Sequence, residues 1–80
     1  TEERRKELVK EIKKISEDSK IAIRNIRRDS IDVYKAKQKA SEITEDDQKY
    51  GEEKLQKITD EFVKKIDEIA EAKTKEIMEI

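Results

Sequence analysis

The chain has 80 residues, of which 20 are Lys or Arg and 21 are Asp or Glu, so that 51% is charged and only 32% is hydrophobic. It contains no Cys and no His, which excludes a disulfide framework, a thiolate zinc site, a cysteine nucleophile and an imidazole base. The longest apolar run is Ile21–Ile23, whereas a membrane span needs about 20 apolar residues. We therefore expect one non-enzymatic, cofactor-free unit without a membrane partner, in the cytoplasm or in an organelle.

The two halves of the chain carry opposite charge. Residues 1–40 hold 13 basic and 8 acidic side chains, and residues 41–80 hold 7 basic and 13 acidic ones. All five Arg residues lie within the first 28 positions. This split indicates a first half that faces an anion and a second half that does not.

The first half predicts one long helix over about residues 2–40, because it has no Gly or Pro and is rich in Glu, Lys, Ile and Ala. Thr1 followed by Glu2 and Glu3 is typical of a capped helix start. A stripe with alternating spacings of four and three predicts the buried seam of this helix, with Val9 and Ile23 beside it. The stripe occupies positions 8, 12, 15, 19, 22, 26, 29, 33, 36 and 40.

A turn at about residues 41–43 and a second helix over about 45–79 follow. Thr44 with Asp47 three residues later resembles a capping box. Gly51 indicates a frayed first turn, and Tyr34 and Tyr50 are expected to pack beside the hairpin turn. The apolar stripe of this helix is Leu55, Ile58, Phe62, Ile66, Ile69, Ile77 and Ile80, with Val63, Ala70 and Met78 beside it.

A turn this short predicts an antiparallel hairpin in which residue i lies opposite about residue 84 − i. This register places Ile26 against Ile58, Ile15 against Ile69 and Ala22 against Phe62 in the seam. The apolar residues beside the seam require a further helix, from the same chain, from a partner or from a second copy.

Basic residues follow one side of the first helix. On a helical wheel they lie within about 60° of Arg24, on the side opposite the predicted seam. Such a ridge is either a solvated surface or an electrostatic footprint for a phosphate backbone. Ile21 and Ile31 are apolar residues on the same outward side. The ridge comprises Lys6, Lys10, Lys13, Lys20, Arg24, Arg27, Arg28 and Lys35, and acids flank it at Glu7, Glu11, Asp18, Asp29 and Asp32.

Several stretches of the chain together resemble the ribosome recycling factor family of bacteria and organelles. The central stretch is RNIRRD at 24–29, and the others are TEERRKEL (1–8), EITEDD (42–47), QKITD (56–60), KKI (64–66) and EIMEI (76–80). The resemblance runs over the whole chain. It implies an all-α fold in which this long antiparallel hairpin is two of the three helices of a bundle. The family's first helix and its inserted β-rich domain have no counterpart here.

The resemblance implies a function in translation. The family binds the large ribosomal subunit after termination and, with elongation factor G and GTP, splits the post-termination complex. Its second helix contacts 23S-type rRNA. Carried over to this chain, and extended along the ridge, the implied rRNA-binding residues are Arg24, Asn25, Arg27, Arg28, Lys20 and Lys13, with Arg27 the first choice.

Two alternatives stay open at this point. The chain fits a structural antiparallel coiled coil or an engineered helical scaffold without ribosome activity. The second alternative is that the chain associates with itself to replace the missing helix, because a hairpin of this size buries little surface on its own.

Overall fold

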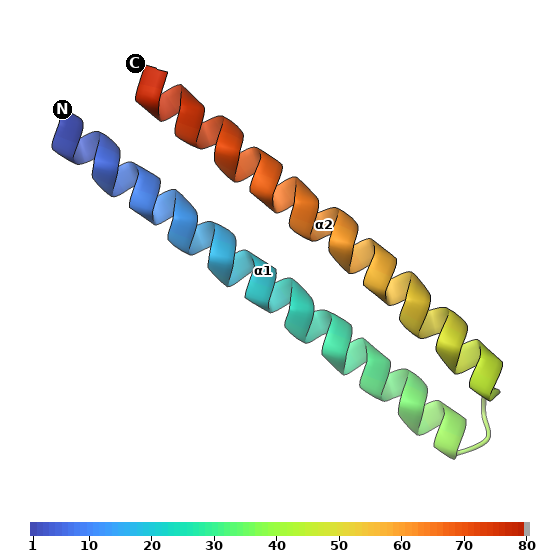
Figure 1. Cartoon of the computed structure of the whole chain (residues 1–80). Helices are drawn as coiled ribbons and strands as arrows, with labels where there is room; N and C mark the ends of the chain where they lie inside the picture. The colour runs from blue at the N-terminus through green and yellow to red at the C-terminus, as the bar shows by residue number, and fades with distance from the viewer. Residues whose placement is uncertain (80) are drawn as a thin grey trace.

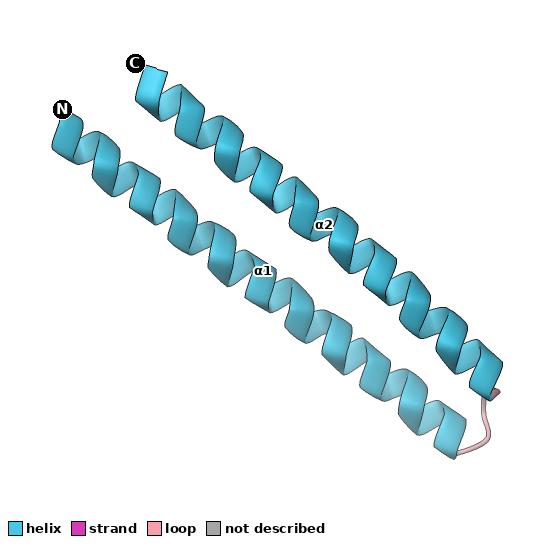
Figure 2. Ribbon diagram, in the orientation of Figure 1, coloured by secondary structure: helices cyan, strands magenta, loops and turns pink. Residues whose placement is uncertain are grey.

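Two long helices make up the chain. In the computed structural model, which describes residues 1–79, α1 spans Glu2–Lys39 and α2 spans Glu45–Glu79 (Figure 1). The helices run side by side in opposite directions and a short loop joins them (Figure 2). The Cα atoms extend over 60 × 15 × 9 Å. The all-α antiparallel hairpin predicted from the sequence is confirmed, and Ile80, which was assigned to the apolar stripe, lies outside the described residues.

Threonine caps begin both helices. The Thr1 hydroxyl oxygen accepts a hydrogen bond from the Arg4 N–H at 3.2 Å. At the start of α2 the Asp47 N–H donates to Thr44 Oγ1 at 3.0 Å, and the Thr44 N–H donates to Asp47 Oδ2 at 3.1 Å. This reciprocal pair is a capping box with Asp in the position usual for Glu, so the helix start predicted at Thr44 is confirmed.

A left-handed residue ends α1. Ser41 has φ 59°, and its N–H donates to the Gln38 carbonyl at 3.0 Å. The Glu42 N–H donates to the Lys37 carbonyl at 2.9 Å. These two bonds form a Schellman motif, which satisfies the last carbonyls of the helix and reverses the chain.

Small residues form the centre of the seam between the helices. Ser16 and Thr59 are the most buried side chains with 7% and 4% exposure, and Gly51 is buried as well. The Thr59 hydroxyl donates to the Leu55 carbonyl of its own helix at 2.7 Å, so it needs no partner across the seam. Half-buried apolar side chains surround this line: Leu8, Val9, Ile12, Ile23, Tyr34, Leu55, Val63, Ile66 and Ala70.

The sequence predicted correctly which residues of the two helices lie side by side, but it predicted wrongly which side of α1 faces α2. Ile15 and Ile26, expected in the seam, are 64% and 65% exposed, whereas Val9 and Ile23, expected beside it, are half-buried within it. The seam is rotated by about a quarter turn from the predicted stripe. The predicted pairs still lie at matching levels, because Ile26 and Ile58 line one groove between the helices.

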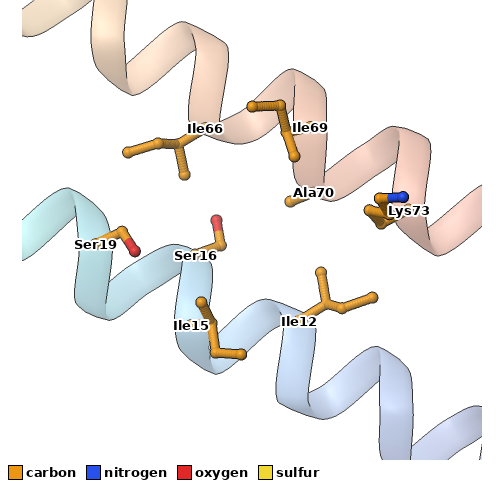
Figure 3. Close-up of a pocket in the computed structure, with 8 residues that line it drawn as sticks. All are labelled: Ile12, Ile15, Ser16, Ser19, Ile66, Ile69, Ala70 and Lys73. Carbon is orange, nitrogen blue, oxygen red and sulfur yellow. The ribbon is translucent and has the colours of Figure 1, made fainter.

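A continuous apolar surface remains open on one side of the hairpin. We call it the open face, and it consists of Ile15, Ile26, Val33, Ile58, Phe62 and Ile69. Two grooves of about 260 and 300 Å³ cross it. In Figure 3, Ile12, Ile15 and Ser16 of α1 lie across the first groove from Ile66, Ile69 and Ala70 of α2. Within residues 1–79 no apolar side chain is buried, so the hairpin has no core of its own.

Gly51 lies under the ring of Tyr34. A Cβ atom at position 51 would stand 2.6 Å from two ring carbons of Tyr34. The prediction of a frayed turn is therefore wrong: Gly51 is helical and buried because the aromatic ring occupies the space of a side chain. Tyr34 packs near the turn as expected, whereas Tyr50 is 64% exposed.

Replacing Gly51 by Ala should destabilise the hairpin by about 1–3 kcal/mol, because overpacking against the ring outweighs the gain of about 1 kcal/mol in helix propensity. Urea unfolding followed by circular dichroism at one protein concentration measures this. The control adds Gly51→Ala to Tyr34→Ala, where the ring is gone and the substitution should be neutral or stabilising. Stabilisation with Tyr34 intact would contradict the contact.

Candidate nucleic-acid interface

Six exposed cations follow one side of α1 over most of its length. At about 100° per residue they fall within about 40° of Arg24 on the helix circumference. Lys13 and Arg24 are about 16 Å apart along the axis at 1.5 Å per residue. We call this set the basic face, and it consists of Lys6, Lys10, Lys13, Arg24, Arg28 and Lys35.

The basic face lies beside the seam and opposite the open face. The seam is about a quarter turn from Arg24, whereas the sequence placed it half a turn away, so that prediction is wrong. The residues half a turn from Arg24 include Ile15 and Val33, which are exposed apolar residues of the open face. The cations and the apolar side chains therefore occupy opposite sides of α1.

Arg24, Asn25 and Arg28 are exposed to solvent. Arg24 and Arg28 are one turn apart on the same side, so their guanidinium groups can reach neighbouring anions. Ile21, 53% exposed, lies one turn before them. Ile31, expected on the same outward side, is half-buried.

Lys20 connects the two helices. Its side chain is only 12% exposed, and Nζ lies 2.9 Å from Glu17 Oε1 and 2.9 Å from Asp67 Oδ1 of α2. The hydrogen bond to Asp67, and then that to Glu17, raise the pKa of Lys20 above its ordinary value of 10.5. Lys20 is thus at the edge of the seam and neutralised by two carboxylates, unlike the exposed ridge lysine expected from the sequence.

Arg27 also reaches across the seam. It is half-buried, and its Nη1 donates to Gln56 Oε1 at 3.2 Å. Gln56 Nε2 in turn donates to Asp60 Oδ1 at 2.8 Å, which fixes the amide. Gln56 and Asp67 were not among the predicted site residues, although the 84 − i register places Gln56 close to the level of Arg27.

Acidic residues of α2 border the basic face. Asp60 and Asp67 lie on the same side of the seam as the Arg27 and Lys20 side chains that face them. An anion that approaches this side meets cations on α1, with the exposed Glu17 among them, and carboxylates on α2. The arrangement restricts an anionic partner to a strip about one helix wide, along α1.

Within residues 1–79 there is no cluster of three potential metal ligands. In the same part of the chain, neither helix carries an apolar stretch long enough to cross a membrane. The grooves of about 260 and 300 Å³ between the helices are lined mainly by apolar side chains and belong to the open face.

Fold and surface together define a class of protein: a long helical hairpin with a cationic strip on one helix and an open apolar face on the other side. Comparison with known proteins makes this more specific. Residues 1–78 match the family model of the ribosome recycling factor. The chain belongs to the ribosome recycling factor family, which confirms the resemblance noted in its sequence.

Curated relatives match along the whole chain. It is 59% identical to the ribosome-recycling factor of Caldicellulosiruptor saccharolyticus, 60% identical to that of Macrococcus caseolyticus and 59% identical to that of Bacillus licheniformis. Each match covers all 80 residues of this chain and 43–44% of the relative. The chain thus spans less than half the length of the curated relatives it matches.

Removing the Lys20 ammonium should lower the thermal midpoint at neutral pH. Because folding raises the pKa of Lys20, its stabilising contribution is present below pH 10.5 and is lost as the pH rises through the raised value. The difference in midpoint between the natural chain and Lys20→Met should therefore close at strongly alkaline pH. Lys10→Met, which removes an exposed lysine of the same helix, is the control. A difference independent of pH would contradict the ion pairs.

Proposed function

We propose that α1 is the rRNA-binding element of a ribosome recycling factor and docks along its basic face on the large ribosomal subunit. The observation that carries the proposal is the exposure of Arg24, Asn25 and Arg28 on one side of α1 in a chain that belongs to this family. Lys13 extends the same contact by three turns.

Arginine suits this contact chemically. A guanidinium group forms two parallel hydrogen bonds with a phosphate and is more weakly hydrated than an ammonium, so it loses less on leaving water. Each phosphate that is neutralised releases condensed counterions, which makes the affinity fall with salt. Asn25 adds one donor and one acceptor beside the two arginines, for a ribose or a base edge.

Lys20 and Arg27 have a different place in the proposal. Both hold α1 against α2, and Arg27, whose acceptor is a neutral amide, keeps its charge beside the basic face. We assign them a positioning role in the free protein. Arg27 can exchange Gln56 for a phosphate when the subunit is bound, because a charged acceptor forms a stronger hydrogen bond than a neutral amide oxygen.

The mechanism that we propose is non-enzymatic. α1 supplies a straight cationic edge on a rod of 60 Å that lies on rRNA, while elongation factor G with GTP supplies the energy that separates the subunits. The work takes place in the cytoplasm, where ribosomes terminate. Because the chain covers 44% of its relatives, we assign it the subunit contact and assign the splitting of the complex to the longer protein.

Replacing Arg24 and Arg28 together by Ala should weaken binding to large subunits about 10-fold to 100-fold at moderate salt, and should reduce the salt slope by about 2. Sedimentation of the chain with purified large subunits at several salt concentrations measures both. The control is Lys64→Ala with Lys75→Ala, which removes two exposed charges from α2. Unchanged affinity in the arginine variant would reject the proposal in favour of a purely structural hairpin.

Arg27 should show two separable effects. Arg27→Ala should lower both the thermal midpoint and the subunit affinity, whereas Gln56→Ala removes the same interhelical hydrogen bond and should lower the midpoint alone. Thermal unfolding and subunit binding are measured on both variants. Equal losses of affinity in the two variants would show that Arg27 acts only by holding the helices together.

A further inference from the structure

A gap interrupts the basic face near the middle of α1. Its exposed cations form two groups, which are Lys6, Lys10 and Lys13 on one side of the gap and Arg24, Arg28 and Lys35 on the other. The gap between Lys13 and Arg24 is about 16 Å long at 1.5 Å per residue. On the same side of α1, the helix period places Glu17, Lys20 and Ile21 within the gap.

Two carboxylates and one ammonium occupy the gap. Lys20 Nζ lies 2.9 Å from Glu17 Oε1 and 2.9 Å from Asp67 Oδ1. The Lys20 side chain is only 12% exposed, whereas those of Glu17 and Asp67 are 65% and 56% exposed. We call these three residues the gap cluster. With two acids to one base, it presents a net charge of −1 to an approaching ligand.

The hairpin does not depend on Glu17 for the contact between its helices. Asp67 alone balances the charge of Lys20 and joins α2 to α1, whereas Glu17 contacts Lys20 from within the same helix. An exposed acid that pairs with a base three residues away on one helix contributes little to stability. Glu17 therefore places a surplus negative charge at the centre of a cationic strip, where it weakens the general attraction for anions.

We propose that the gap cluster, with Glu17 as its exposed member, is a specificity element of the basic face. It accepts an RNA duplex that presents two separate rows of phosphates and rejects a strand that presents one continuous row. Each group of cations contacts one of the two rows. This inference rests on the proposed function and concerns the shape of RNA that α1 distinguishes.

Two rows of phosphates border each groove of an RNA duplex. The minor groove of A-form RNA is wide and shallow, and it displays 2′-hydroxyl groups and base edges between these rows. When α1 crosses this groove, Lys13 and Arg24 lie at its two borders and the gap lies over its floor. The Glu17 carboxylate then faces hydroxyl donors, and Ile21, which is 53% exposed, faces the apolar parts of the riboses.

A single strand that lies along α1 meets the gap differently. Its phosphates follow one another without interruption, so a strand that reaches both groups of cations also places phosphates beside the Glu17 carboxylate. Like charges at this separation repel each other. An unfavourable contact with the wrong partner raises specificity as a favourable contact with the right one does. Glu17 thus lowers the affinity for single strands more than the affinity for duplexes.

Glu17→Gln tests the specificity element and keeps the size of the side chain. The 80-residue chain is titrated into a labelled RNA duplex of about 16 base pairs and into a single strand of the same length, at one moderate salt concentration. The substitution should raise the affinity for the single strand about 5-fold and that for the duplex less than about 2-fold. Glu11→Gln, which neutralises an exposed glutamate of α1 outside the basic face, is the matched control and should change both affinities alike.

The outcomes separate this inference from the proposed function. Equal gains for the two RNAs in Glu17→Gln, or no gain for the single strand, would overturn the specificity role. If Arg24→Ala with Arg28→Ala still weakens binding to large subunits, the proposed function survives that result and this inference alone is rejected. If the arginine variant binds large subunits unchanged, the basic face is not the contact and both proposals fail.

Glu17→Lys closes the gap with a cation. The basic face then becomes continuous, so the salt slope for the single strand should steepen by about 0.7, which corresponds to one further phosphate contact. The slope for the duplex should stay the same, because position 17 lies over the floor of the groove. Circular dichroism checks that the variant keeps its helical content, and Lys20 retains Asp67 as its partner. An unchanged slope for the single strand, or equal steepening for both RNAs, would contradict the proposal.

Discussion

The close approach of α1 and α2 along small side chains determines where every other residue points. Ser16, Gly51 and Thr59 are buried because they are small enough to lie between two helix backbones, and the Tyr34 ring fills the space above Gly51. A seam through Ile15 and Ile26 would hold the helices farther apart. The hairpin instead packs its small residues inside and leaves its largest apolar side chains on one side.

This rotation divides α1 into three surfaces. The seam takes one quarter of the circumference, the open face lies beside it, and the basic face lies on its other side. Lys20 and Arg27 fall on the border between the basic face and the seam. For this reason they bond to Asp67 and Gln56 of α2, while Arg24 and Arg28 remain free of the seam.

The sequence was sufficient to predict the two helices, their N-terminal caps and which residues of α1 and α2 lie side by side. Thr44 with Asp47 marks a helix start by local chemistry, and the short turn determines which residues share a level. The rotation could not be predicted in the same way, because a helix with two apolar contact surfaces shows one wide stripe. Its centre, near Ile15 and Ile26, lies on the open face, and the true seam is at its edge.

The candidate site was predictable to the extent that it depends on one helix. The exposure of Lys13, Arg24, Asn25 and Arg28 follows from the wheel of α1 under either rotation. The state of Lys20 and Arg27 depends on α2, because their partners Asp67 and Gln56 lie 47 and 29 residues away in the chain. A wheel of α1 contains no such information.

The basic face and the open face lie on opposite sides of α1, and this links anion binding to the stability of the hairpin. A cover on the open face lies half a turn away from Arg24, so it leaves the basic face accessible. Such a cover adds the apolar core that residues 1–79 lack, and thereby stiffens the rod on which the cations are arranged. A stiff row of cations loses less conformational entropy on binding than a flexible one, so burial on one side of α1 supports anion binding on the other.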